Sequence, residues 1–181
     1  MSAPSPAVAE RAPHARPARQ PADTAADAAL AVLRVYDGAW RVRPGPGRPA
    51  DRLVNRCVRT TRYYACEQTV NDTVRVLLVF APADSAGRLL PGRFVTQAVA
   101  PDGHALGRGT LAVAGARWTY LGEDRAADGR VTYYRTVNVF DGRDRIRYEL
   151  ARSSDGAHWT VTGGGEEERA SPAPPAGAPP A

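Results

Sequence analysis

The spacing of the apolar residues changes once along this chain, close to Trp40. Upstream of that residue, apolar side chains recur every three or four positions, which is the period of an amphipathic helix. The stripe that they form consists of Ala25, Ala29, Val32, Leu33 and Tyr36. The pattern therefore predicts one short helix over residues 23–37, and Gly38 is expected to end it.

From residue 39 onward, apolar and polar residues alternate, as they do along a strand with one buried face. The alternation is clearest in a run whose same-face residues are Val74, Val76, Leu78 and Phe80. Turn-forming pairs such as Asn71-Asp72 and Asp141-Gly142 interrupt it about every ten residues. Strands are expected at residues 39–43, 53–60, 63–71, 74–81, 93–100, 107–114, 117–123, 131–140, 144–151 and 158–168, with some of them merging.

So many short antiparallel strands must hide their edges, and closure into a barrel does this completely. The predicted fold class is mostly β, a single antiparallel up-and-down barrel of about eight to ten strands with one short N-terminal helix. This domain is expected to span residues 23–169. The flanking residues 1–22 and 170–181 are rich in Pro and Ala and have little to bury, so we expect disordered tails.

The charge is uneven along the chain. All 24 basic residues are Arg, against 19 acids, and residues 41–62 hold seven of them with the single acid Asp51. This Arg-rich segment is either a solvated face or a surface for a polyanion or a protein partner. A specific nucleic-acid site is not expected, because Tyr63 and Tyr64 would point to opposite faces instead of forming a stacking platform.

No run of apolar residues approaches the roughly 18 that a membrane-spanning helix needs. The N-terminus also lacks the apolar core of a secretory signal, since Pro6 and Glu10 flank Ala7–Ala9. We therefore expect a soluble protein, cytoplasmic as the sequence stands, and periplasmic or secreted if translation starts elsewhere. The sequence predicts no oligomeric state.

The two cysteines fall on neighbouring predicted strands. If Cys57 lies opposite Cys66, residue 60 lies opposite residue 63, so the two strands form a short hairpin and a disulfide is possible. The alternatives are two buried free thiols or a redox pair. A zinc site is not expected, because these cysteines are accompanied by only three histidines in the chain.

The sequence contains no recognisable catalytic or cofactor-binding motif. Gly107-Arg108-Gly109 is interpreted as the turn into a strand, because no helix follows whose N-terminus would bind a phosphate. We therefore predict no cofactor, no metal and no catalytic residue, and we favour a protein that is not an enzyme.

A small closed barrel can hold one ligand in its interior. The candidate ligand-binding residues are Arg62, Tyr64, Glu67, Tyr134, Arg135 and Asn138. Tyr134 and Arg135 cannot both face inward on a regular strand, so they are alternatives, and an inward Arg135 would need Glu67 or Glu149 as its partner. The competing interpretation is that these polar residues face water and the barrel interior is packed.

A helix followed at once by Gly38-Ala39-Trp40 is similar to the start of lipocalin-like (calycin) barrels. Across residues 28–169 the chain resembles bacterial lipocalin-like families of unknown function. The matching features are Phe80–Asp84, Gly107–Tyr120, Ser153–Trp159 and the Glu-Glu-Glu-Arg run that ends at Arg169. The second lipocalin motif, Thr-Asp-Tyr, is not found.

The resemblance implies that Trp40 closes the base of the barrel and that Arg169 or Arg147 packs over its ring. It also implies a binding or carrier protein for a small amphipathic ligand. Nitrobindin-like barrels resemble this architecture and bind haem through a histidine near their last strands, which would make His158 a candidate; the alternative is a surface histidine in a hairpin. The remaining hypotheses are an interaction module that uses the Arg-rich segment and, third, a haem-binding or simple isomerase-like barrel.

Overall fold

The computed structural model describes residues 21–83 and 87–170, with side chains from residue 25 onward. The predicted fold class is confirmed, because ten antiparallel strands close into one barrel with a single helical segment before them. Residues 1–20 and 171–181, which make up most of the expected disordered tails, lie outside the described residues. Within the described ranges, no helix has the length and apolar character needed to cross a membrane.

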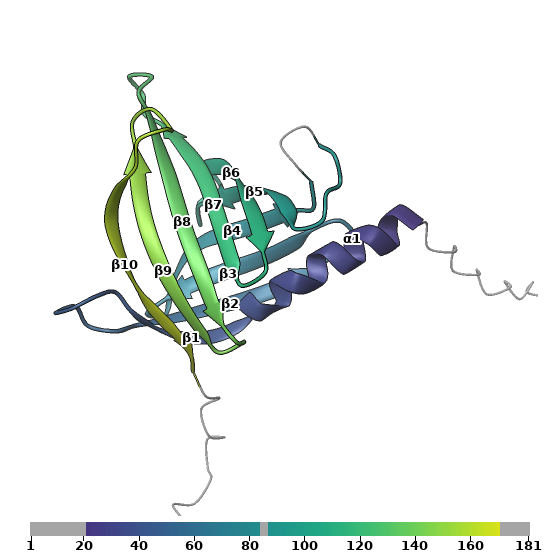
Figure 1. Cartoon of the computed structure of the whole chain (residues 1–181), viewed down its shortest axis with the longest axis horizontal. Helices are drawn as coiled ribbons and strands as arrows, with labels where there is room; N and C mark the ends of the chain where they lie inside the picture. The colour runs from purple at the N-terminus through teal and green to yellow at the C-terminus, as the bar shows by residue number, and fades with distance from the viewer. Residues whose placement is uncertain (1–20, 84–86, 171–181) are drawn as a thin grey trace, which may run out of the picture.

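Each strand pairs with its neighbours in sequence, and β1 also pairs with β10 to close the barrel (Figure 1). The strands are β1 (Gly38–Arg43), β2 (Asp51–Arg59), β3 (Tyr64–Val70), β4 (Thr73–Ala81), β5 (Arg93–Val99), β6 (Ala105–Ala114), β7 (Arg117–Arg125), β8 (Val131–Asp141), β9 (Arg145–Ser153) and β10 (Thr160–Arg169). All ten expected strands are present, and none has merged with its neighbour.

The helical segment lies across the end of the barrel at which β1 begins (Figure 1). It consists of α1 (Pro21–Ala31) and a 3₁₀ turn, η1 (Val32–Tyr36). Its buried residues are Ala26, Leu30 and Leu33, whereas Ala25 and Val32 of the expected stripe are exposed. The predicted stripe was correct for Leu33 and Tyr36, which pack in the core, and wrong for Ala25 and Val32, because alanines occur on both sides of this helix and do not mark the face that packs.

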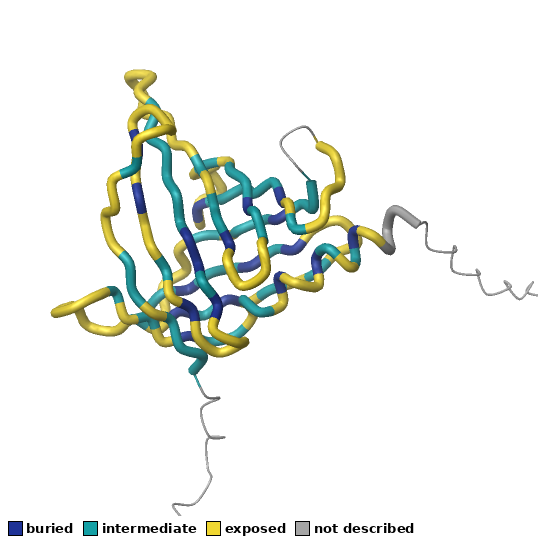
Figure 2. Tube along the Cα trace, in the orientation of Figure 1, coloured by how far each residue is buried: buried dark blue, intermediate teal, exposed yellow. Residues whose placement is uncertain are grey.

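Large side chains fill the half of the barrel next to the helix, which we call the base. Its fully or almost fully buried residues include Leu30, Leu33, Trp40, Tyr64, Phe80, Phe94, Leu111, Trp118 and Ile146. They come from the helical segment and from the strand ends nearest to it, so the helix and the barrel share one core. Figure 2 shows the buried residues gathered toward this end and exposed loops at the opposite end.

Trp40 lies at the centre of the base, and the resemblance predicted its role correctly. Trp40 is opposite Arg169 in the pairing of β1 with β10, and the Arg169 guanidinium carbon lies 4.3 Å from the centre of the Trp40 ring. Arg169 also donates to the carbonyls of Val35 and Asp37. Gly38 has φ +110°, and a Cβ there would lie 3.2 Å from the guanidinium, so this first position of the motif favours glycine.

The hairpin of β2 and β3 carries the predicted disulfide. Cys57 lies directly opposite Cys66 in the strand register, and their sulfur atoms are bonded. Cys66 is buried in the barrel interior and Cys57 packs against the same core. The bond therefore joins two strands of the barrel wall at the level where the packed base ends.

Candidate functional site

The half of the barrel farther from the helix contains a cavity of about 660 Å³. Its walls come from every strand, including Val42 near the end of β1 and Asp51 at the start of β2. A volume of this size is typical of sites for small organic molecules. The expectation of a filled interior is therefore wrong for this half of the barrel.

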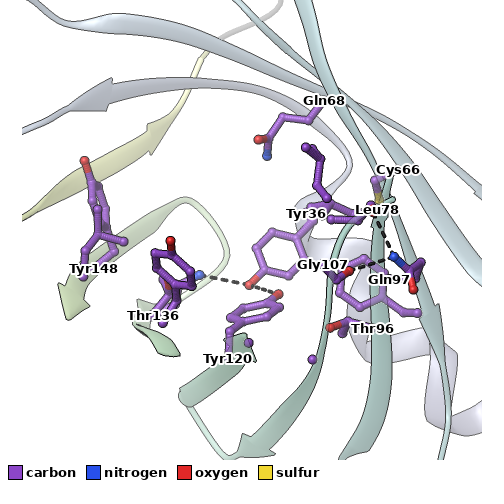
Figure 3. Close-up of a pocket in the computed structure, with 18 of the residues that line it drawn as sticks. Tyr36, Cys66, Gln68, Leu78, Thr96, Gln97, Gly107, Tyr120, Thr136 and Tyr148 are labelled. Atoms are coloured by element: carbon purple, nitrogen blue, oxygen red, sulfur yellow. Dashed lines mark hydrogen bonds between the residues drawn. The ribbon is translucent and has the colours of Figure 1, made fainter. Parts of the chain in front are cut away.

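A hydrogen-bonded cluster forms the floor of the cavity, directly above the packed base. The Tyr120 hydroxyl donates to the Tyr36 hydroxyl at 2.7 Å, and the Asn138 side-chain amide donates to the same oxygen at 3.0 Å (Figure 3). Burial raises the pKa of both tyrosines, so both are neutral hydrogen-bonding groups at neutral pH. The Tyr36 ring also packs edge-on against the Trp118 ring, and the two ring centres are 5.2 Å apart.

Asn138 has hydrogen-bonding capacity that the floor does not use. Only 7% of the residue is exposed, and its Oδ1 has no hydrogen-bond partner among the described residues. Buried side-chain oxygens without a donor are rare in folded proteins, because burial costs them their hydrogen bonds to water. This oxygen is enclosed by protein atoms, so its unmet acceptor belongs to the floor itself and is not a contact point for a ligand in the cavity.

One wall of the cavity carries a partly buried carboxylate, Glu167. Its cross-strand neighbours are Val42 on β1 and Ile146 on β9, both apolar. Burial raises the pKa of Glu167 from 4.5 to about 7. At neutral pH this group therefore exists in both the neutral and the charged form.

Tyr148 and Asp51 lie close to Glu167 on the same side of the cavity. Both carboxylates raise the pKa of the Tyr148 hydroxyl, although its burial is the larger cause. That hydroxyl lies against Gly165, because a Cβ built there would be 2.9 Å from it. The absence of a side chain at residue 165 thus gives Tyr148 its place beside β10.

Glycines form the opposite wall. Gly107, Gly109 and Gly122 occupy inward positions of β6 and β7, where every other residue faces the interior. The interpretation of Gly107-Arg108-Gly109 as a strand-entry turn was wrong, because these residues lie within β6. A Cβ at Gly109 would collide with the carbonyl oxygen of Leu121, so the close approach of the strands requires glycine at this position. The missing side chain also leaves the cavity wide.

The structure separates the predicted ligand-binding residues. Tyr134 and Asn138 line the cavity together with Thr136, so this register of β8 is the correct alternative. Arg135 faces outward, where it lies 3.5 Å from Glu149 and 4.9 Å from the centre of the Trp159 ring. Glu149 was named as a partner only for an inward Arg135, so this pair on the outer surface does not test that expectation.

The three candidates from the earlier hairpin do not line the cavity, although Gln68 of the same hairpin does. Arg62 lies in the exposed loop between β2 and β3, at the base end of the barrel. Tyr64 faces inward but is buried in the packed base. Glu67 faces outward and lies 3.7 Å from Arg56.

Both histidines within the described residues lie in exposed turns away from the cavity. His158 contacts Asp155 at 2.7 Å in the loop between β9 and β10, with 92% of its side chain exposed. His104 contacts Asp102 in the loop between β5 and β6. The surface-hairpin interpretation of His158 is therefore correct, and neither side chain faces an enclosed site that would hold a haem.

The Arg-rich segment is partly neutralised by acids from other elements. Its ion pairs are Arg43 with Glu168, Arg52 with Asp72, Arg56 with Glu67 and Arg59 with Asp27. These pairs are distributed over β1 and β2, and three of them are on the outer surface. The hypothesis of a polyanion surface stays a prediction, as does the expectation that it is not a specific nucleic-acid site.

Tyr36, Tyr120, Tyr148, Asp51 and Glu167 line the cavity but were not among the predicted site residues. Glu167 had a signal in the sequence, because an inward Arg169 above Trp40 requires an inward residue two positions earlier. Tyr148 had one as well, since it alternates with Ile146. Tyr36 had none, because only the docking of the helical segment brings its hydroxyl into the barrel.

Comparison with known proteins yields a likeness in fold. No family model matches the chain, and no curated protein matches it. The crystal structure of Rv2717c from M. tuberculosis is similar, with a TM-score of 0.47 and 18% sequence identity over 79% of this chain and 98% of that chain. The lipocalin-like assignment therefore stays a prediction beyond the observed ten-stranded barrel.

Proposed function

We propose that this protein binds one small amphipathic molecule in the open half of its barrel, as a carrier or binding protein. The observation that carries the proposal is the cavity of about 660 Å³ above a packed base, with polar groups at its floor and on one wall. A folded chain gains stability by filling its interior, so a large cavity lowers the stability of the fold. A binding function explains why such a cavity is kept.

The lining supports an amphipathic ligand over a purely apolar or purely polar one. Leu78, Phe80 and Leu150 supply apolar surface, and the hydroxyls of Tyr36 and Tyr148 supply hydrogen bonds. Sites for small organic molecules combine these two features, with a few polar groups that fix the orientation. No constellation of nucleophile, base and oxyanion donors accompanies them in the described residues, which favours binding over catalysis.

The first experiment blocks the cavity and compares that change with the same change on the outer surface. Thr136→Phe places a ring inside the cavity, and Thr119→Phe places one on the outward face of the adjacent strand β7. Binding of the neutral fluorescent probe N-phenyl-1-naphthylamine is measured by titration. We expect saturable binding to the natural protein and to Thr119→Phe, and at least about a tenfold loss in Thr136→Phe.

Native mass spectrometry of protein purified gently from its source then tests for a retained molecule. The proposal predicts an added mass that is lost from Thr136→Phe and kept by Thr119→Phe. If the probe binds none of the three proteins and no added mass is found, the proposal is wrong. Equal binding by all three would place the site elsewhere on the molecule and would contradict it as well.

A further inference from the structure

The charges inside the cavity have the opposite sign to those of the whole protein. The chain carries a formal charge of +5, with 24 basic and 19 acidic residues. The charged residues at inward positions of the cavity are Asp51, Asp124 and Glu167. Arg108 and Glu123 also border it, but they are opposite each other at outward positions of β6 and β7.

Glu167 has no hydrogen bond or ion pair to any described residue. The charged groups around it are engaged elsewhere or share its sign. Arg169, two residues along the same face, is directed into the base, where it bonds the Asp144 carboxylate at 2.9 Å as well as backbone carbonyls. From β1 the group that faces Glu167 is Val42, and from β9 it is Ile146.

The other titratable groups near Glu167 on this face are acids and tyrosines, and farther along β9 Arg152 shares the face, with its guanidinium carbon 5.4 Å from the centre of the Tyr134 ring. Tyr148 of β9 and Asp51 of β2 lie at the same level as Glu167. The charge of Glu167 also acts on the hydroxyls of Tyr36 and Tyr120 across the cavity. Arg48, in the exposed loop between β1 and β2, acts on the Tyr148 hydroxyl and is the cation at the edge of this group.

Aromatic rings surround the same space. Tyr36 and Tyr120 have their ring centres 6.4 Å apart, and Phe80 lies 6.4 Å from Tyr120 on the other side. Tyr148 stands across the cavity from this pair, as Figure 3 shows. Faces of aromatic rings attract cations, and a set of such rings next to a carboxylate is the usual arrangement for an alkylammonium group.

From these contacts we propose that the ligand is an organic cation, an apolar body that carries an ammonium group bound between Glu167 and the tyrosine rings. The inference rests on the proposed function and specifies its ligand. A metal ion does not fit, because the described residues contain no cluster of three or more metal-ligating side chains.

The test uses four probes that share an eight-carbon chain and differ only in the head group. They are octyltrimethylammonium, octylamine, 1-octanol and octanoate, each titrated calorimetrically at pH 8 and below its micelle concentration. We expect the two ammonium compounds to bind at least about tenfold more tightly than octanol, and octanoate to bind most weakly. This series uses the natural protein, so it does not depend on the folding of any variant.

Two variants assign the effect to one carboxylate. Glu167→Gln should lower the affinity for octyltrimethylammonium about tenfold and leave that for octanol unchanged. Glu166→Gln, the same change at the adjacent outward position, should leave both unchanged. Because octyltrimethylammonium does not titrate, its affinity should fall by about tenfold in total as the pH drops through the pKa of Glu167, and then level off near the affinity of Glu167→Gln.

The outcomes separate the two proposals. Equal affinity for all four head groups, or tightest binding of octanoate, overturns the cation inference and leaves a cavity that binds small molecules. Tight ammonium binding that Glu167→Gln does not weaken also overturns it. If none of the four probes binds and N-phenyl-1-naphthylamine does not bind either, the proposed function itself fails.

Discussion

The two halves of this barrel are built from the same ten strands, but their inward positions carry side chains of very different volume. In the base, Trp40, Phe94 and Leu111 meet the helix residue Leu33, and all four are at most 1% exposed. In the open half, corresponding positions of β5 and β6 carry Ala98 and glycines, and a cavity remains.

This difference teaches how one architecture combines stability with a binding site. Apolar burial and close packing are concentrated in the base, where the helical segment covers the barrel end and each large side chain has neighbours on all sides. Polar and ionisable groups are concentrated in the open half. The same groups in the packed base would lower stability, because they would be surrounded by apolar residues and would lack hydrogen-bond partners. Substitutions in the two halves should therefore have different consequences.

The largest effect is expected for Trp40→Ala. The change removes a fully buried ring and the support for the Arg169 guanidinium, so the free energy of unfolding should fall by about 3–5 kcal/mol. Tyr134→Ala, in the wall of the cavity, should cost no more than about 1 kcal/mol, because its ring lines the cavity and its cation contact is the exposed Arg152 guanidinium, 5.4 Å from the ring centre. Urea unfolding curves measure both, and equal losses would show that the halves are packed alike.

Removal of the disulfide should have the next largest effect. The double variant Cys57→Ala, Cys66→Ala loses the restriction of a loop of nine residues in the unfolded chain, worth about 2–3 kcal/mol. The same loss should appear when the natural protein is unfolded in the presence of a reductant. An unchanged unfolding midpoint under reducing conditions would contradict a structural role for the bond.

The pH dependence of stability tests the partly buried carboxylate. Because the pKa of Glu167 is raised to about 7 in the folded state, its protonated form is favoured there, and the benefit is complete below pH 4.5 and lost as the pH rises through 7. Glu167→Gln should match the natural protein at pH 4 and be more stable by up to about 3 kcal/mol at pH 8. The stability of Glu166→Gln should not diverge from that of the natural protein as the pH rises. A constant difference between Glu167→Gln and the natural protein at all pH values would argue against the burial of Glu167.

The smallest effect is expected where a side chain is added to the cavity. Ala98→Leu fills open space, so stability should change by less than about 0.5 kcal/mol while binding of N-phenyl-1-naphthylamine weakens. Leu111→Phe enlarges a side chain in the packed base and should cost about 1–3 kcal/mol. A thermal unfolding comparison of the pair measures the difference between the halves directly, and a large loss in Ala98→Leu would mean that the open half is filled.

Features that depend on local sequence were predictable. Strand positions follow from the two-residue period and the turn pairs, because these set the backbone locally. The register of a short hairpin made the Cys57–Cys66 bond possible, and Arg169 was one of the two arginines that the resemblance to lipocalin-like barrels placed over Trp40. Tyr134 and Asn138 were among the candidates, although the pattern could not choose between their face of β8 and that of Arg135.

That choice was open because polar residues occur on both faces of β8. Arg135 faces water beside Glu149, and Tyr134 faces a cavity that is itself partly polar, so hydropathy does not distinguish the two sides. The same ambiguity affected the helix, whose alanines are compatible with either face. In both cases the direction of the side chains is set by packing against distant elements.

The sequence by itself determined the kind of barrel and the approximate positions of its strands, and it named the Cys57–Cys66 bond and the Trp40–Arg169 contact among a few alternatives. Only the tertiary structure decided that one half is packed and the other is hollow, because a cavity is the sum of small side chains at inward positions on many strands. It also brought Tyr36 from the helical segment, Tyr120 from β7 and Glu167 from β10 into one space. Those residues are far apart in the chain, and they become neighbours through closure of the barrel and docking of the helical segment on its end.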